Sequence, residues 1–246
     1  SADDLRFTTF PTSRVELLRL IERHRPGVIL IEACLLCGWV RDLCVEVGVN
    51  CLIANTSSEA WKFKHLKRKT DKDDAVRLAE VYRLGKFPSV NIPEKEIREK
   101  RGLIETRQKL VGRRVALQNR IRAVLVSQGL PAPVGAKAWS EIGLAGIAAH
   151  ARPIAECSPL ELWRGRLHLA LQELAGVKVL LVQAEKKLDQ MAKDNEGMKI
   201  LDTIPGVGPR TAEAVVAFLP EPKLIRTSKQ VSAYGGFVPR QYQSTD

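Results

Sequence analysis

The first ninety residues alternate between helical and strand-like hydrophobic patterns. Residues 15–21 are amphipathic with a helical period, and residues 27–32 form a short apolar run after a Pro-Gly turn. A second helical pattern extends to Val47, residues 49–54 form a second strand-like run, and residues 70–86 have the period of a third helix. Helices alternating with short strands predict an α/β sheet with mainly parallel pairing.

Beyond Pro93 the pattern becomes one of long helices. Residues 94–128 form a polar helix with apolar residues seven apart, and after Leu160 apolar residues recur at alternating spacings of three and four. Residues 131–159, rich in Ala, Gly and Pro, separate the two. This arrangement predicts an antiparallel hairpin or a dimerising coiled coil, with ordinary helical packing on the first domain as the alternative. The spaced apolar residues are Leu103, Leu110, Leu117 and Val124, then Leu174, Val177, Leu181, Ala184, Leu188 and Met191.

The last segment has the pattern of two short helices joined by a tight glycine loop. A helix ends at residues 200–203, the loop IPGVGP follows, and residues 210–219 form the next helix. This is the pattern of a helix-hairpin-helix, in which backbone N–H groups hold a phosphate without reading sequence. The predicted nucleic-acid contacts are Gly206, Val207, Gly208 and Arg210; a plain interhelical turn is the alternative. The expected domains are therefore residues 1–92, 93–195 and 196–246.

The net charge of the chain indicates which class of partner it binds. Among 246 residues, Lys and Arg number 39 and Asp and Glu 28, so the formal charge is 39 − 28 = +11. Such an excess favours a polyanion, nucleic acid before a membrane. Hydrophobic residues at 45% exclude wholesale disorder. No run approaches the ~18 consecutive apolar residues of a membrane span.

The five cysteines indicate a reducing, cytoplasmic protein. Their number is odd, and no second CxxC or paired His follows Cys34 and Cys37 at zinc spacing. Cys34, Cys37 and Cys44 are spaced as one face of a helix, which favours small buried hydrophobic side chains over metal or redox chemistry.

Three carboxylates are the sharpest candidates for chemistry. Asp71 and Asp74 would project from one side of a helical first turn, and Glu32 ends a predicted strand. The carboxyl ends of strands line the ligand crevice of α/β sheets, so the set predicts a Mg²⁺ or Mn²⁺ site suited to phosphodiester chemistry. The alternative for Asp71 and Asp74 is helix capping. The adjacent cations Lys67, Arg68 and Lys69 would suit a phosphate backbone.

Four motifs resemble the DEDD insertion-sequence transposases, the IS-one-ten family. Residues 69–80, KTDKDDAVRLAE, and residues 31–33, IEA, resemble its acidic elements. Residues 201–208, LDTIPGVG, and residues 234–244, YGGFVPRQYQS, resemble the two signatures of its C-terminal transposase domain. The motifs occur in the family's order along nearly the whole chain.

The resemblance implies a fold and a mechanism. The fold would be α/β plus α: a RuvC-like, ribonuclease-H-type domain, a coiled coil, and a transposase domain. Glu32, Asp71 and Asp74 would be three of four metal-binding acids, and Ser244 the nucleophile that forms a phosphoserine linkage with DNA. The implied partners are the element ends and target DNA, a structured guide RNA and further copies of the chain, as a dimer or tetramer.

Two departures from the family pattern lead us to expect a fragment. The family's first Asp lies on an opening strand far upstream of its Glu, whereas residues 1–11 resemble a later strand. The chain also stops two residues after Ser244. We therefore expect an incomplete metal site and incomplete recombinase activity. The alternatives are a non-catalytic nucleic-acid-binding protein and a metal-dependent junction nuclease that ignores Ser244.

Overall fold

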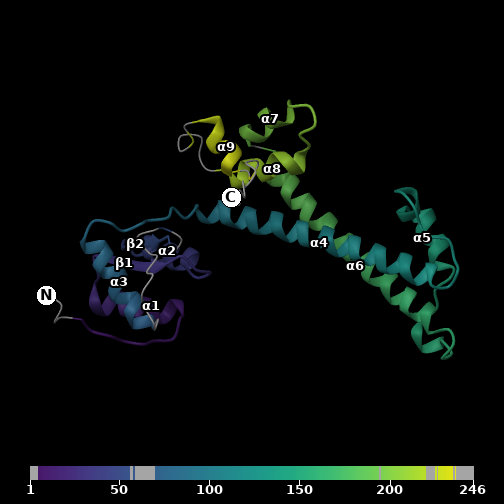
Figure 1. Ribbon diagram of the computed structural model, residues 1–246, viewed down its shortest axis with the longest axis horizontal. Coiled ribbons are helices and arrows are strands. Elements are labelled where there is room, and N and C mark those ends of the chain that lie inside the picture. The colour runs from purple at the N-terminus through teal and green to yellow at the C-terminus, as the bar shows by residue number, and fades with distance from the viewer. Residues whose placement is uncertain are drawn as a thin grey trace, which may run out of the picture. The chain divides into compact units, whose positions relative to one another are not determined.

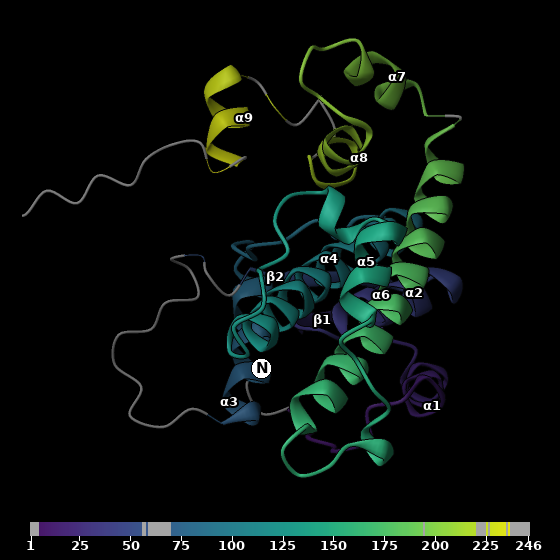
Figure 2. The same ribbon diagram turned by 90° about the vertical axis from the view of Figure 1, so that its right-hand side faces the viewer.

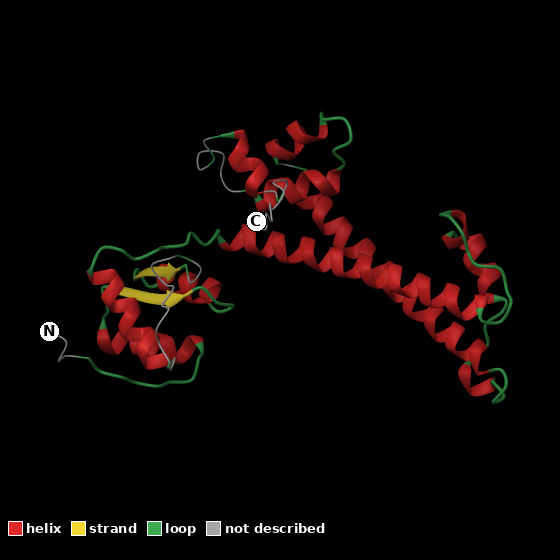
Figure 3. Ribbon diagram, viewed as in Figure 1, coloured by secondary structure: helices red, strands yellow, loops and turns green. Residues whose placement is uncertain are grey.

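The computed structural model describes residues 5–55, 58, 70–193, 195–219, 225, 227–234 and 236. The chain divides into two compact units, Ser1–Glu96 and Ile97–Asp246. The described strands both lie in the first unit, and the second is helical (Figure 3).

The first unit is a β–α–β arrangement with two further helices. Its elements are α1 Arg14–His24, β1 Val28–Glu32, α2 Cys37–Glu46, β2 Asn50–Ala54 and α3 Asp71–Arg83. The strands pair in parallel, with Val28 opposite Asn50 and Glu32 opposite Ala54. The predicted α/β character and parallel pairing are confirmed for these elements.

The two faces of β1 pack against different helices, because side chains alternate across a strand. Ile29 and Ile31 join the buried cluster built by α1 and α2. Leu30 instead packs with Leu78 of α3. Glu32 lies two residues after Leu30, so its side chain belongs to the α3 face of the strand.

Residues 5–12 form no strand, so the strand expected over residues 1–11 is not found in its described part. Phe7 is about half exposed, and the ammonium of Lys72 lies 5.5 Å from the centre of its ring. The segment pairs with no described strand, which leaves its alternating apolar residues largely exposed.

The cysteines are only partly the buried set that their spacing predicted. Cys44 is fully buried, but α2 begins at Cys37, so Cys34 precedes the helix and is exposed. The interpretation of Cys34 as part of a buried helical face was therefore wrong. Burial raises the pKa of Cys44, and burial beside Cys44 raises the pKa of Cys51 to about 12. Both thiols stay protonated at neutral pH.

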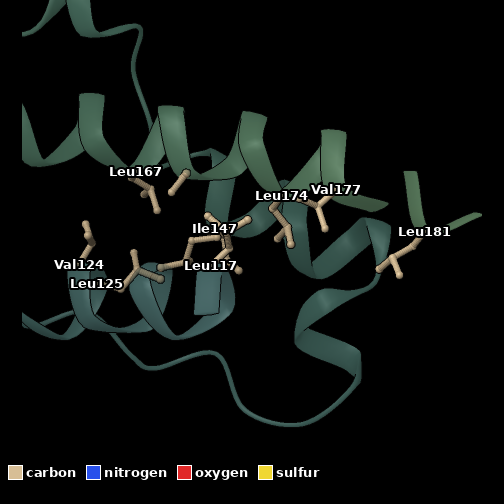
Figure 4. Close-up of a cluster of buried hydrophobic side chains, with 10 residues drawn as sticks. Leu117, Val124, Leu125, Ile147, Leu167, Leu174, Val177 and Leu181 are labelled. Carbon is tan, nitrogen blue, oxygen red and sulfur yellow. The ribbon is translucent and has the colours of Figure 1, made fainter. Parts of the chain in front are cut away.

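The second unit is built on a long antiparallel hairpin of α4 Lys95–Val126 and α6 Leu162–Ala192 (Figures 1 and 2). Arg107 pairs with Glu185 and Arg113 with Glu173, so later residues of α4 meet earlier residues of α6. The predicted hairpin is confirmed, and it closes within one chain. Its buried seam (Figure 4) consists of Leu117, Ile121, Val124, Leu125, Ile147, Leu167, Ala170, Leu174, Val177 and Leu181.

The break between the two long helices is more ordered than its composition predicted. It contains η3 Lys137–Trp139, α5 Glu141–Ala148 and η4 Ile154–Glu156. Ile147 of α5 packs into the hairpin seam. A Cβ at Gly143 would lie 2.5 Å from the carbonyl oxygen of Ala138. This glycine therefore permits close packing of α5.

Three short helices complete the described chain: α7 Glu196–Asp202, α8 Pro209–Phe218 and α9 Ser228–Tyr234. The α7–α8 pair joined by a glycine loop agrees with the predicted order of helix, loop and helix. The side chain of Asn195 caps α7 by accepting from the N–H of Met198 at 3.0 Å.

The helix α6 is long and apolar enough, by length and composition, to cross a membrane. The same property follows from its place in the hairpin, where eight of its residues are buried. A single helix of this kind is weak evidence for a membrane span, because core helices of soluble proteins pass the same test.

Candidate metal and nucleic-acid sites

The first turn of α3 is fixed by a side-chain cap. Thr70 is the N-cap residue, and its Oγ1 accepts from the N–H of Asp73 at 3.2 Å. The same hydroxyl donates to Oδ2 of Asp73 at 2.6 Å. Asp73 is thus the capping acid, which leaves Asp71 and Asp74 as the first-turn acids outside this cap. Asp71 is exposed and Asp74 is half-buried.

Glu32 has a buried carboxylate oxygen at the end of β1. Its Oε1 is buried and has no hydrogen-bond partner among the residues that the structure describes. An unpaired buried carboxylate oxygen is costly, and a bound cation is one way to satisfy it. The residue ends β1 on the side covered by α3, so Glu32 lies on the sheet face that packs against that helix.

The three acids do not form a ready-made metal cluster. Among the residues that the structure describes, no group of three or more His, Cys, Asp or Glu side chains could hold a metal ion as it stands. The structure therefore brings Glu32 and α3 to one side of the sheet without gathering all three carboxylates around one point. The chemistry of the donors still fits Mg²⁺ or Mn²⁺, because all are hard oxygens.

The other two predicted elements of this chemistry, the cations Lys67, Arg68 and Lys69 and the serine Ser244, lie outside the described residues.

The α7–α8 loop is shaped by one glycine and left open by another. Gly206 has a φ of +87°, which L side chains rarely adopt, and the N–H of Val207 closes the turn on Ile204 O at 3.0 Å. Gly208 is the N-cap of α8, with an ordinary extended φ and open space where a Cβ would lie. Nothing within the described chain requires glycine there, and Ser or Asp would cap better. A glycine at this point leaves the helix N-terminus accessible to an anion.

Arg210 follows this loop, but its charge is already engaged. Its guanidinium donates to Oε2 of Glu213 at 2.8 Å and pairs with Asp189 of α6. Glu213 is buried, and desolvation raises its pKa against the opposing effect of Arg210. Sequence reasoning missed Glu213. Its signal was an acid three residues after Arg210, on the apolar face that also carries Ala212 and Ala217.

The basic helix α4 likewise has fewer cations available for nucleic acid than its sequence predicted. Residues 98–122 hold nine cations against two acids. Four of the cations bind within the second unit: Arg101 to Ala217 O, Arg107 to Glu185, Arg113 to Glu173, and Arg122 to Pro133 O. Lys109 and Arg120 are exposed and, within the described part of the chain, make no hydrogen bond or ion pair.

Comparison with known proteins gives a consistent picture. Residues 10–128 match the family model for DEDD transposases of the IS110 type, and residues 198–246 match the model described as "Transposase IS116/IS110/IS902 family". The two matches contain the candidate metal-binding acids Glu32, Asp71 and Asp74, the glycine loop and Ser244.

Similar curated proteins point the same way. The chain is 28% identical to a transposase for insertion sequence element IS1111A from Coxiella burnetii, over 94% of this chain and 62% of the relative. It is 27% identical to a putative transposase of Sinorhizobium fredii and 28% identical to a probable family 20 transposase of Pseudomonas aeruginosa, again over 94% of this chain. It spans 58% and 67% of those two relatives.

Proposed function

The chain belongs to the IS110 family of transposases, and from this premise we propose that it acts in DNA transposition of an insertion sequence. The observation that supports the chemistry best is Glu32 at the end of β1, whose buried Oε1 has no hydrogen-bond partner in the described part of the chain. We propose that Glu32, Asp71 and Asp74 hold Mg²⁺ or Mn²⁺ within a RuvC-like domain. The metal would supply positive charge to a scissile phosphate.

Ser244 is the proposed nucleophile. Its Oγ would attack the phosphorus, a phosphoserine bond would form, and the DNA hydroxyl on the other side would leave with the proton. The support is the match of residues 198–246 to the transposase family. DNA ends, a target DNA and a structured guide RNA are the proposed partners, and a dimer or tetramer the proposed assembly.

We propose that the α7–α8 loop acts as a helix-hairpin-helix phosphate contact. Gly206, Val207 and Gly208 would present backbone N–H groups at the start of α8, and the uncapped Gly208 supports this role. Lys67, Arg68 and Lys69 would add a sequence-independent contact to the phosphate backbone. We also propose a cytoplasmic location, supported by five free cysteines.

A covalent-adduct assay tests the reaction. The chain is incubated with element-end DNA, guide RNA and Mg²⁺, and protein–DNA adducts are separated under denaturing conditions. We expect Ser244→Ala to abolish the adduct, with Thr245→Ala as the matched hydroxyl control. Asp74→Asn should remove it too, whereas Asp73→Asn should keep it because the Asp73 carboxylate is engaged by the N-cap residue Thr70.

The same assay separates the alternatives. A junction nuclease would cleave DNA with metal and lose that activity in Asp74→Asn, but it would be indifferent to Ser244→Ala. A non-catalytic binding protein would be unaffected by either change in binding, yet Gly206→Val and Gly208→Val would weaken it. DNA binding that survives both Gly206→Val and Gly208→Val would contradict the proposed phosphate contact of the loop.

A further inference from the structure

The start of α8 is held on the hairpin by charged side chains that the proposed reaction does not use. Arg210 donates to Oε2 of Glu213 at 2.8 Å with one nitrogen and pairs with Asp189 of α6 with the other. The Glu213 side chain is only 3% exposed and that of Arg210 25% exposed. The pair with Glu213 lies within α8 and, being largely desolvated, fixes the Arg210 side chain, whereas the pair with Asp189, which is 58% exposed, is the contact that reaches the hairpin.

The end of α8 is held as well, by the other helix of the hairpin. Nε of Arg101 on α4 donates to the carbonyl of Ala217 at 2.6 Å, and its guanidinium lies 5.2 Å from the ring centre of Phe218. A cation at the last turn satisfies a carbonyl that the helix itself leaves open. Ala217 also packs with Ile104 of α4 and Leu188 of α6.

This arrangement bears on the loop that precedes α8. With both ends of α8 pinned, Gly206 and Gly208 are carried on a rigid base rather than on a free helix pair. Glu213 and Asp189 bring negative charge close to that loop, and such charge would repel a phosphate. Attraction of a phosphate therefore does not explain why Glu213 and Asp189 lie near the loop.

We propose that Arg210 is a positioning residue: held by Glu213 and Asp189, it orients the α7–α8 loop on the hairpin so that the loop meets a nucleic-acid phosphate in a fixed geometry. This inference rests on the proposed phosphate contact of the loop. It assigns Arg210 a different role from the direct phosphate contact expected from sequence.

The inference is tested by removing a negative charge near the loop and measuring whether DNA binding weakens or tightens. Binding of the whole chain to a short DNA duplex is measured by fluorescence anisotropy for Arg210→Gln, Asp189→Asn and Glu213→Gln. Positioning predicts that all three weaken binding, by about tenfold, the equivalent of one charge-assisted hydrogen bond. Arg210→Gln combined with Asp189→Asn should be no weaker than the worse single variant, because both disrupt one joint.

Asp202→Asn is the matched control. Asp202 is exposed at the end of α7, nearer the loop in sequence than Asp189, and within the described residues it forms no ion pair. Its substitution removes the same charge without touching Arg210, so it should leave binding unchanged or tighten it. Hydrogen exchange of the α8 amides should rise in Asp189→Asn and stay the same in Asp202→Asn.

Tighter or unchanged binding in Asp189→Asn would overturn the positioning role. Asp189 is 58% exposed, so Asp189→Asn should fold normally and its DNA binding can be measured even if Glu213→Gln folds poorly. The underlying loop proposal has its own control: Gly206→Val should weaken binding. If Gly206→Val has no effect, the loop is not the contact; if it weakens binding while Asp189→Asn does not, only the positioning role fails.

Discussion

The two units of the chain are stabilised in different ways. Among the described residues, the hairpin unit has a seam of ten buried residues, whereas the largest cluster of the sheet unit has five, around two strands. Burial of apolar surface is the dominant stabilising term in both. The difference indicates that the described part of the hairpin unit has a larger apolar core to stabilise it than the described part of the sheet unit.

Charge is distributed just as unequally. The hairpin unit uses Arg101, Arg107 and Arg113 on its own carbonyls and carboxylates. In the sheet unit the buried Oε1 of Glu32 has no hydrogen-bond partner among the described residues 5–55, 58 and 70–96 or elsewhere in the described chain. The lesson is that a high cation count on a helix does not measure its capacity for nucleic acid, and that a single unsatisfied acid can be the better sign of chemistry.

The largest expected effect lies in the hairpin seam. Leu174 is 1% exposed, so Leu174→Ala should lower the free energy of unfolding by about 2–5 kcal/mol through lost burial and the cavity left behind. Leu180, on the same helix but 47% exposed, is the matched control, and Leu180→Ala should cost less than about 0.5 kcal/mol. Urea unfolding followed by circular dichroism measures both. Equal losses would show that α6 is not packed on α4.

A smaller effect is expected at the cap of α3 in the sheet unit. Thr70→Ala removes the acceptor for the N–H of Asp73 and should cost about 1 kcal/mol. Thr106→Ala in α4, whose hydroxyl bonds the carbonyl of Gly102 in mid-helix, should cost less. Hydrogen exchange at the start of α3 locates the loss. If hydrogen exchange in the first turn of α3 is unchanged in Thr70→Ala, the Thr70 cap does not stabilise that helix.

The buried acid of α8 should make stability depend on pH. Burial raises the pKa of Glu213 above its usual value despite Arg210, with Arg107 opposing and Asp189 adding to the rise. The folded state then binds the proton more tightly than the unfolded one, so this contribution favours the fold at low pH and is lost as pH rises through the raised pKa. The unfolding free energy of the native chain minus that of Glu213→Gln should therefore fall from about pH 4 to about pH 7. A rise would mean that Arg210 outweighs desolvation.

The smallest effect is expected at the surface of the hairpin. Arg113 and Glu173 are paired at 2.6 Å but are 60% and 36% exposed. Arg113→Gln should cost at most about 1 kcal/mol, and the cost should shrink in high salt. Thermal unfolding at two salt concentrations measures it. A large, salt-independent loss would show that the pair contributes more than an exposed ion pair normally does.

Periodicity was enough to predict most of the elements. Helices and strands in the sheet unit and both long helices of the hairpin follow from spacings of two, three and four. The helix α5 was missed because it is short and its Gly143 has a packing role that depends on the carbonyl of Ala138. Cys34 was misplaced because α2 begins three residues later than the spacing implied.

The candidate site was only partly accessible to the same reasoning. The hydrogen bonds of Thr70 identify Asp73 as the acid engaged by the α3 cap and so distinguish it from Asp71 and Asp74. The role of Arg210 depended on Asp189, which is 21 residues away in sequence. Contacts between helices decide which charges remain available, and sequence spacing within one helix does not report them.

Binding of Mn²⁺ to the whole chain, followed by loss of the free-ion signal in electron paramagnetic resonance, tests the central claim most directly. The claim is that the unsatisfied acid of β1 and the first-turn acids of α3 form a metal site. Glu32→Gln and Asp74→Asn should each weaken Mn²⁺ binding by at least about tenfold, and Asp73→Asn should leave it unchanged. Absence of Mn²⁺ binding by the native chain, or equal weakening by Asp73→Asn, would contradict the account.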